Sequence, residues 1–301
     1  MIYTVTLNPA VDYVAECCEI AVGAVNRLDG GEIYFGGKGI NVSLVLHELG
    51  IKSAALGFIA GFTGEAIEKG VRGMGVETSF IRLDSGFSRI NIKLRNGTAN
   101  ETELNGNGPE IPENKVMELF RKLDNISSGD TIVLAGSIPP SLSADIYEKI
   151  LERLQNKNIR AVVDASGELL LNVLKYKPFL VKPNNIELGN LYNVTIDTAE
   201  KAVEYAFRLK DAGAVNVLVS MGELGAVLID ENRKIHTAEA FSGTVKNTVG
   251  SGDSMVAGFI AGLEKRGYSY ALRLGTACGG ATAFSDGLAS ADEIFRLMGE
   301  D

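Results

Sequence analysis

The sequence predicts an α/β protein in which a central, mainly parallel sheet has helices on both faces. Short apolar segments alternate along most of the chain with longer segments in which apolar residues recur every three or four positions. Strands and helices that alternate in this way are typical of parallel sheets, because each helix returns the chain to the start of the next strand. Two further stretches near the N-terminus alternate loosely between apolar and polar residues, which predicts a small additional β-sheet.

The elements of the main sheet follow one another along the chain in a regular order. The first strand covers residues 1–8 and ends at the turn-forming pair Asn8-Pro9. Further strands are predicted at 53–60, 131–135, 161–164, 179–181, 215–220 and 226–229. Helices are predicted at 42–49, 63–73, 113–124, 144–156, 199–212, 253–265 and 269–284. The first of these helices ends at Gly50, since glycine commonly follows a helix C-terminus.

The small sheet is predicted to be built from two separate pieces of chain. Its strands fall at 13–20, 25–35, 88–95 and 101–106, with a hairpin turn at Asn96-Gly97. The two pieces, 9–36 and 86–108, are too thin to bury a core of their own. We therefore expect one β-lid inserted into a larger domain, which consists of residues 1–8, 37–85 and 109–301.

Composition excludes several classes of function. The net charge of −9 provides no basic footprint for nucleic acid or an anionic membrane, so a phosphate substrate would need its own cluster of Lys and Arg. No apolar run approaches the ~20 residues of a membrane span, and no basic leader precedes the first strand, which predicts a cytoplasmic protein. Cys17 and Cys18 are adjacent and Cys278 is remote, which is neither a disulfide framework nor a zinc site.

The stretch with the most chemical information runs from Asn247 to Phe259. Gly250 and Gly252 permit a tight turn, and apolar residues at helical spacing follow Asp253. A glycine-rich turn at a helix N-terminus holds an anion with free N–H groups, and an adjacent carboxylate can take a proton from a hydroxyl. The alternative is that Asp253 only caps the helix, as aspartate does in many α/β proteins.

Polar residues also end the predicted strands, where the ligand of an open parallel sheet binds. They are Asn8, Asp12, Ser137, Lys182, Asn184, Ser220 and Gly222. A second glycine-rich turn at Gly36–Asn41 precedes the first helix. The sequence contains no P-loop motif, no protein-kinase motifs and no dinucleotide-binding fingerprint with its distal acid.

Taken together, Gly36–Ser43 and Asn247–Asp253 resemble the paired signatures of the ribokinase-like carbohydrate kinases. The resemblance extends over essentially the whole chain and includes Thr6–Asp12, Gly136–Pro140 and Lys182–Glu187. It implies the ribokinase-like fold, ATP as phosphoryl donor and Mg²⁺ as the accompanying ion. Within the family, Ser88–Leu94 and Glu103–Pro109 favour the members that phosphorylate fructose-1-phosphate at its 6-hydroxyl over those that act on tagatose-6-phosphate.

The resemblance also implies catalytic roles. Asp253 would be the base, and the N–H groups of Gly250, Ser251 and Gly252 would form the anion hole for the transferred phosphoryl group. Ser251 stands where many family members have alanine, which a hole made of backbone groups should tolerate. Glu187 would organise Mg²⁺ through water. The positions that match ATP contacts are Lys182, Asn184, Ser220, Gly222 and Thr248.

The sugar phosphate would be bound by residues of the lid and of the first helix. Asp12 would hold the sugar hydroxyls, and the same pocket would include Gly37, Asn41 and Ser137. Arg27 and Arg89 would bind the phosphate of the substrate, because guanidinium binds phosphate bidentately. Lys38 could contact either that phosphate or the transferred group. These cations disfavour a neutral-sugar or nucleoside kinase, and the intact base and anion hole disfavour a catalytically idle sensor. The exposed edge of the lid suggests a homodimer.

Overall fold

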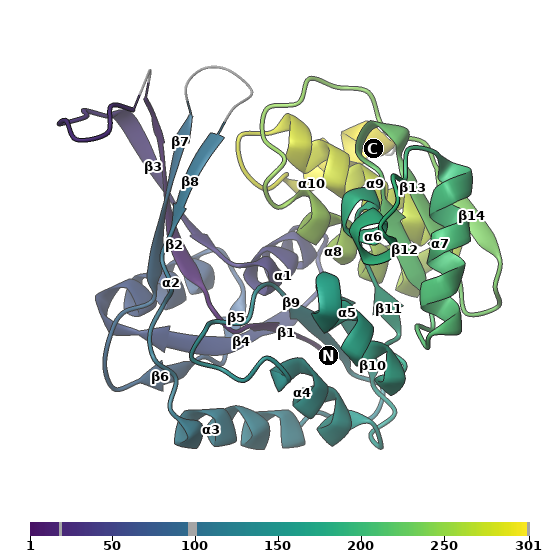
Figure 1. Ribbon diagram of the computed structural model, residues 1–301, viewed down its shortest axis with the longest axis horizontal. Coiled ribbons are helices and arrows are strands. Elements are labelled where there is room, and N and C mark those ends of the chain that lie inside the picture. The colour runs from purple at the N-terminus through teal and green to yellow at the C-terminus, as the bar shows by residue number, and fades with distance from the viewer. Residues whose placement is uncertain (18–19, 96–100, 300–301) are drawn as a thin grey trace.

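The computed structural model describes residues 1–17, 20–95 and 101–299, and it contains two sheets (Figure 1). The larger sheet lies between two layers of helices, and the smaller sheet rises from one end of the molecule as the purple and blue strands of Figure 1. The predicted turn at Asn96-Gly97 and Cys18 lie outside the described residues.

The main sheet has ten strands in the order β14-β13-β12-β11-β10-β9-β1-β4-β5, with β6 also paired to β4. Its strands are β1 (Ile2–Thr6), β4 (Ser53–Ala60), β5 (Glu77–Thr78), β6 (Ile81–Leu83), β9 (Thr131–Ala135), β10 (Arg160–Asp164), β11 (Leu180–Val181), β12 (Val217–Ser220), β13 (Ala226–Ile229) and β14 (Ile235–Ala238). All neighbours pair in parallel except β12–β13 and β13–β14. The connections at these two pairs are too short for a parallel crossover, which needs a dozen or more residues. The predicted mainly parallel α/β fold is confirmed.

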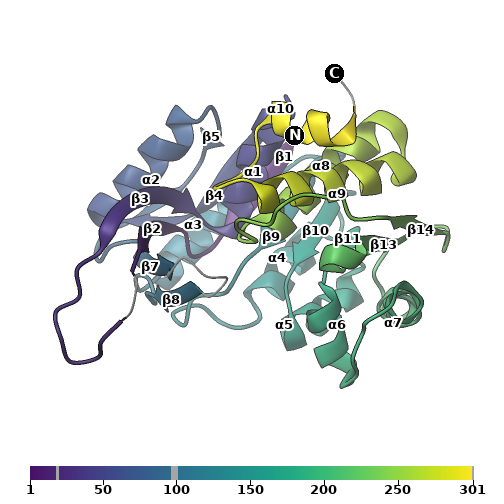
Figure 2. The ribbon, with the colours of Figure 1, turned by 90° about the horizontal axis from the view of Figure 1, so that it is seen from above.

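Helices cover both faces of this sheet, as Figure 2 shows from above. They are α1 (Lys38–Glu48), α2 (Gly61–Gly73), α3 (Glu113–Asp124), α4 (Ile146–Leu154), α5 (Gly167–Val173), α6 (Asn185–Tyr192), α7 (Ala199–Asp211), α8 (Ser251–Arg266), α9 (Tyr268–Phe284) and α10 (Ala291–Met298), with short 3₁₀ turns at Leu174–Tyr176 and Gly222–Leu224. Buried side chains of α3 to α7 share one of the two larger cores, and most of those of α1 share the other with α8, α9 and α10, while α2 packs with Ile40 of α1 in a smaller third cluster. Among the described residues, no helix is long and apolar enough to cross a bilayer.

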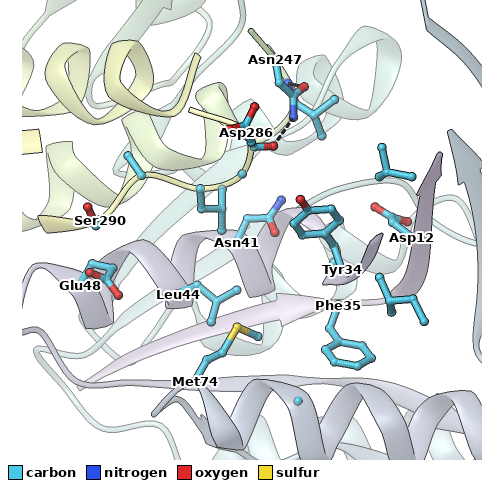
Figure 3. A pocket seen from close by; sticks show the side chains of 18 of the residues that line it. Asp12, Tyr34, Phe35, Asn41, Leu44, Glu48, Met74, Asn247, Asp286 and Ser290 are labelled. Carbon is cyan, nitrogen blue, oxygen red and sulfur yellow. Dashed lines mark hydrogen bonds between the residues drawn. The ribbon is translucent and has the colours of Figure 1, made fainter. Parts of the chain in front are cut away.

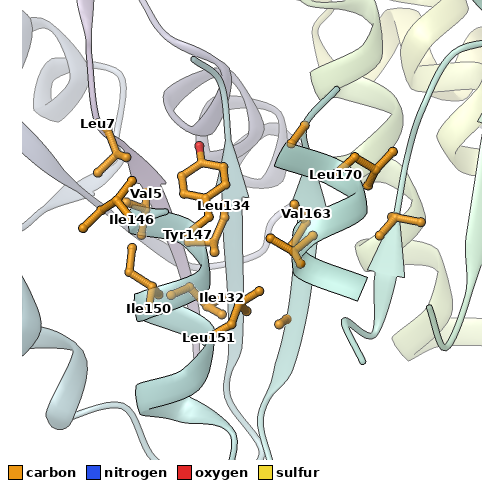
Figure 4. Packing of buried hydrophobic residues seen from close by; sticks show 14 of the residues in the cluster. Val5, Leu7, Ile132, Leu134, Ile146, Tyr147, Ile150, Leu151, Val163 and Leu170 are labelled. Carbon is orange, nitrogen blue, oxygen red and sulfur yellow. The ribbon is translucent and has the colours of Figure 1, made fainter. Parts of the chain in front are cut away.

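The alternation of side chains along the central strands produces these two cores. In β9, Ile132 and Leu134 pack into the core of α3 to α7, whereas Val133 and Ala135 pack into the core of α1 and α8 to α10. Figure 4 shows Leu134 beside Tyr147 and Ile132 beside Leu151, both residues of α4. The Tyr147 ring is fully buried, and its hydroxyl donates a hydrogen bond to the Gly136 carbonyl oxygen at 3.0 Å. This bond connects α4 to the carboxyl end of β9, where the functional pocket begins.

The small sheet consists of β2 (Ala10–Glu16), β3 (Asp29–Gly36), β7 (Arg89–Arg95) and β8 (Glu101–Asn105), in the order β3-β2-β7-β8. Its two outer pairs are antiparallel, whereas β2 and β7 pair in parallel although the whole of β4 to β6 separates them in sequence. The register places Asp12 opposite both Tyr34 and Asn91, and Asn91 opposite Asn105. Because opposed residues share a face, this row of polar side chains lies on one side of the sheet.

Several elements were not predicted from the sequence. Helices α5, α6 and α10 have seven or eight residues each, too few for a clear helical period. A usable signal was the capping box, in which Asn184 and Ser290 begin α6 and α10 and a glutamate follows three residues later. Asp12, expected after the first strand, lies inside β2, and the helix expected from residue 253 begins at Ser251.

Candidate active site

A pocket of about 430 Å³ lies between the carboxyl ends of the main-sheet strands and the polar face of the small sheet. The main domain lines it with Gly37, Lys38, Asn41, Asp164, Lys182, Asn184, Glu187, Ser220, Thr248, Val249, Gly250, Gly252 and Asp253. The small sheet contributes Ala10, Asp12, Arg89, Asn91, Lys93, Glu103 and Asn105. Most predicted site residues therefore meet in one cavity, which requires segments from both ends of the chain.

The glycine-rich turn opens into the N-terminus of α8. Gly250 has a φ of 81°, in the left-handed region that favours glycine, and a Cβ there would also require the Leu288 side chain to move, since its Cδ2 would lie 2.7 Å away. The N–H groups of Gly252 and Asp253 lie in the first helical turn, where no intrahelical acceptor exists. The Ser251 N–H donates to the Thr248 carbonyl at 3.2 Å, and the buried Ser251 hydroxyl has no hydrogen-bond partner among the described residues.

Asp253 is buried at the centre of the pocket. Its exposed fraction is 5%, and its Oδ2 accepts a hydrogen bond from Asn41 Nδ2 at 2.8 Å. Burial and the nearby negative charge of Asp164 raise the pKa of Asp253 to about 7, although Lys38, Asn41 and Lys182 oppose the shift. A carboxylate with a pKa near the working pH is well suited to accept a proton from a hydroxyl.

Asp164, at the end of β10, is a site residue that was not singled out from the sequence. Its exposed fraction is 1%, and it forms ion pairs with Lys38 Nζ at 3.2 Å and Lys182 Nζ at 3.4 Å. Burial raises the pKa of the Asp164 carboxyl, but the two lysines outweigh burial and hold this pKa below its ordinary value. The rule that polar residues at strand ends face the ligand could have identified Asp164, because it ends a predicted strand.

The polar face of the small sheet surrounds Asp12. Asn91 Nδ2 donates to Asp12 Oδ1 at 2.7 Å, and Lys93 Nζ lies 3.5 Å from Asp12 Oδ2. Arg89 Nε donates to the Asn8 carbonyl oxygen at 3.0 Å, which orients the guanidinium along the pocket. Burial lowers the pKa of Arg89, against the opposing charge of Asp12. The sequence-based assignment did not include Asn91, Lys93, Glu103 and Asn105.

The opposite end of the pocket is built around the start of α6. Asn184 Oδ1 accepts from the Glu187 N–H at 2.7 Å, and Glu187 Oε2 accepts from the Asn184 N–H at 2.8 Å. The capping box uses only one carboxylate oxygen of Glu187. The other oxygen remains available to the pocket, which Glu187 lines. Asn184 also forms a parallel bridge to Ser220, so two of the predicted nucleotide contacts are held side by side.

Four predicted site residues lie outside the lining of this pocket. Arg27 is exposed in the loop between β2 and β3, and Ser137 and Gly222 are exposed beyond the ends of β9 and β12. Ser251 is half-buried in the first turn of α8, with its side chain directed away from the cavity into the protein. The local sequence does not reveal the direction in which a loop leaves its strand.

A second pocket of about 790 Å³ adjoins the first and shares Asp12, Asn41, Lys93 and Val249 with it. Figure 3 shows its walls, formed by the small sheet, α1 and the segment from Asp286 to Ser290. Tyr34 stands in this space between Asp12 and Asn41 (Figure 3). The hydroxyl of Tyr34 donates to Glu32, and this bond, together with burial, raises its pKa to about 12.

Residues 5–294 match the model of the pfkB family carbohydrate kinases. The chain belongs to this family. The 1-phosphofructokinase of Bacillus subtilis (strain 168) is 45% identical over 301 residues, which cover 100% of this chain and 98% of that protein. The D-tagatose-1-phosphate kinase of Bacillus licheniformis is 36% identical and covers 98% of this chain and 96% of its own length. The alternative expected from the sequence was a tagatose-6-phosphate kinase, whereas this family member is named for the 1-phosphate.

A solved structure of the pfkB kinase fold is similar over nearly the whole chain. Phosphofructokinase-2 from Escherichia coli, in complex with substrates and products, has a TM-score of 0.92 at 27% identity and covers 99% of this chain and 98% of its own. The predicted family and the predicted fold are therefore both confirmed.

Proposed function

We propose that this pfkB family member is an ATP-dependent kinase that converts fructose-1-phosphate to fructose-1,6-bisphosphate. The observation that carries the proposal is the position of Asp253, buried at the N-terminus of α8 between the polar face of the small sheet and the start of α6. A sugar phosphate fits the end of the pocket at the small sheet, and a nucleotide fits the end at the start of α6. Asp253 then stands where the acceptor hydroxyl meets the γ-phosphoryl group.

The chemistry follows from this arrangement. Asp253 takes the proton of the 6-hydroxyl while the hydroxyl oxygen forms a bond to the γ-phosphorus and the bond to the ADP oxygen breaks. The free N–H groups at the start of α8 stabilise the negative charge that develops on the transferred group. Lys38 and Lys182, held by Asp164, add positive charge on the nucleotide side. Asp12 orients the sugar by accepting hydrogen bonds from its hydroxyls.

The residues at the nucleotide end also suit Mg²⁺. Asp164 Oδ1 is buried and accepts no hydrogen bond among the described residues, with Lys182 Nζ 3.4 Å away, and Glu187 lines the same pocket with a second carboxylate. Oxygen ligands of this kind, together with water, are those that Mg²⁺ prefers. When bound, Mg²⁺ would offset the negative charge of the ATP phosphates. Asp164 and Glu187 would hold it, with the lysines keeping Asp164 ionised.

The small sheet is proposed to act as a lid over the sugar. It comprises parts of 9–36 and 86–108, and the remaining residues form the kinase domain. Its closure would exclude water and so suppress hydrolysis of ATP. The outer face of the lid exposes Ile33, Ile90 and Leu104. Exposed apolar strands of this kind favour a homodimer formed through the lid. A cytoplasmic location belongs to this proposal, because the enzyme would draw on the ATP of the cytoplasm.

An ADP-release assay with a panel of sugars tests the proposed substrate. With ATP and Mg²⁺, we expect kcat/KM for fructose-1-phosphate to exceed that for tagatose-1-phosphate, tagatose-6-phosphate, fructose-6-phosphate and fructose by ~100-fold or more, a difference of about 2.7 kcal/mol in transition-state binding. Tagatose-1-phosphate is the most demanding comparison, because it differs from fructose-1-phosphate only in the configuration of one ring hydroxyl, to which Asp12 would hydrogen-bond. Equal or better turnover of that sugar would assign the chain to the second activity named among its relatives.

Replacement of Arg89 by alanine should weaken the sugar phosphate selectively. Arg89 belongs to the lid side of the pocket, and a charge-assisted bond to phosphate contributes about 1.5–3 kcal/mol. We expect KM for fructose-1-phosphate to rise ~10–100-fold while KM for ATP changes little. Steady-state kinetics with each substrate varied in turn measure both values. Similar increases in both KM values would contradict this assignment.

A further inference from the structure

The substrate phosphate needs more positive charge than the residues assigned so far supply. Arg27 lies outside the pocket, and the ammonium groups of Lys38 and Lys182 are both paired with Asp164 on the nucleotide side. Arg89 then stands alone among the cations predicted for the sugar end. A phosphate dianion carries up to two charges at neutral pH. A second cation on the lid side is therefore expected.

Lys93 occupies that position and has unused bonding capacity. Its side chain is only 8% exposed, and its Nζ lies 3.5 Å from Asp12 Oδ2 and 3.9 Å from Glu103 Oε1. These are its closest charged partners among the residues that the structure describes, and both distances exceed those of a short charge-assisted hydrogen bond. An ammonium group has three donor hydrogens. Burial of such a group is costly unless an anion or acceptor comes within hydrogen-bond distance.

The sheet register directs Lys93 toward the substrate. Lys93 follows Asn91 by two residues on β7, so both side chains lie on the face that carries Asp12. Lys93 lines the site pocket and also the adjoining larger pocket. Lys93 therefore stands beside Asp12, the residue proposed to hold the sugar hydroxyls, two residues beyond Asn91 along β7. A sugar that reaches Asp253 with one end and Asp12 with its ring presents its other end to this row.

We propose that Lys93 is a specificity-determining residue whose ammonium group binds the phosphate already present on the sugar substrate. The proposal rests on the proposed sugar-phosphate kinase function and adds a second phosphate-binding cation to Arg89. When the phosphate enters, it replaces the two long ion pairs of Lys93 with direct hydrogen bonds. The Lys93 ammonium group then competes less for the Asp12 carboxylate, which accepts hydrogen bonds from the sugar hydroxyls.

The test compares Lys93→Met and Lys93→Arg in the full chain. We expect Lys93→Met to raise KM for fructose-1-phosphate ~10–100-fold, with small effects on kcat and on KM for ATP. Inorganic phosphate, measured as a competitive inhibitor against fructose-1-phosphate, should bind more weakly by a similar factor. Lys93→Arg should recover most of the loss, because it keeps a cation at the same position. Lys115→Met, which removes a lysine paired with Asp84 outside the pocket, is the matched control.

The comparison with unphosphorylated fructose decides between direct and indirect action. If Lys93 only positioned Asp12, Lys93→Met would lower kcat/KM for fructose and fructose-1-phosphate by the same factor, and the proposal would be wrong. A loss confined to phosphorylated sugars supports it. If Lys93→Met does not fold, the double variant Lys93→Met/Glu103→Gln keeps the net charge of the pair and gives the same comparison.

The failure of this proposal is distinguishable from failure of the proposed function. Absence of turnover of any sugar phosphate by the wild-type chain would overturn the kinase function itself. Calorimetric titration of wild type and Lys93→Met with inorganic phosphate and fructose-1-phosphate still tests Lys93 in that case. Equal affinities in the two proteins would then overturn the role of Lys93.

Discussion

Replacement of Asp253 by asparagine should lower kcat by about 10²–10⁴-fold and leave the affinity for both substrates nearly unchanged. Asparagine has the same shape and can still accept the 2.8 Å hydrogen bond from Asn41, so the pocket should persist. What it cannot do is take the proton of the acceptor hydroxyl. Rapid-quench measurement of ADP formation, with binding measured by calorimetry, separates the two effects. Turnover close to that of the wild type would show that Asp253 is not the base.

The pKa of Asp253 adds a pH signature to this prediction. In the wild type, kcat/KM should fall below pH ~7, because the carboxyl with a pKa of about 7 becomes protonated and loses its function as a base. Stability should show the opposite trend. The folded-state pKa lies above the ordinary value of an aspartate carboxyl, so the stabilisation from this group is complete below pH ~4 and is lost as the pH rises through about 7.

Asp253→Asn removes this penalty because its side chain stays neutral. Its Tm should exceed that of the wild type by a few degrees at pH 8, and the difference should disappear near pH 4. Differential scanning calorimetry over this range measures the effect. A Tm difference that does not change with pH would mean that the carboxyl is not destabilised by burial in the folded protein.

Replacement of Asp164 by asparagine should cost both stability and activity. The change leaves the ammonium group of Lys182, with a side chain only 5% exposed, without its counter-charge. Loss of one partner of a buried ion pair costs about 3–5 kcal/mol, so Tm should fall by roughly 5–8 °C. Activity should fall as well, because Asp164 no longer holds the two lysines in position. Circular dichroism melts measure the change in Tm, and steady-state kinetics measure the change in activity.

The pH profile of Asp164→Asn tests its electrostatic role separately. The charge of Asp164 is the second contribution, after burial, that raises the pKa of Asp253. Its removal should therefore move the acid limb of kcat/KM to lower pH. Asp230→Asn is the matched control. It also removes a buried carboxylate, whose Oδ2 lies 2.9 Å from His236 Nε2, but this pair lies outside the pocket. A limb that moves equally in both variants would contradict the coupling between Asp164 and Asp253.

Local patterns were sufficient for the fold class and for the centre of the site. The apolar periods predicted the alternating strands and helices, and the turn from Gly250 to Asp253 indicated a helix N-terminus with an acid at its mouth. Both are properties of a few neighbouring residues, since side-chain period and turn chemistry depend on the adjacent backbone. Short helices such as α6 were missed because seven or eight residues hold too little of a period.

The partners of these residues depend on contacts between distant segments. The sequence by itself determined the sheet and helix order, the glycine-rich turn and the acid beside it. Only the tertiary structure decided that Asp164 lies between Lys38 and Lys182, that Arg27 lies outside the pocket, and that Lys93 shares a face with Asp12. The last follows from the parallel pairing of β2 with β7. A slip of one residue in that register would turn Lys93 to the opposite face, and no local pattern specifies the register of strands so far apart in sequence.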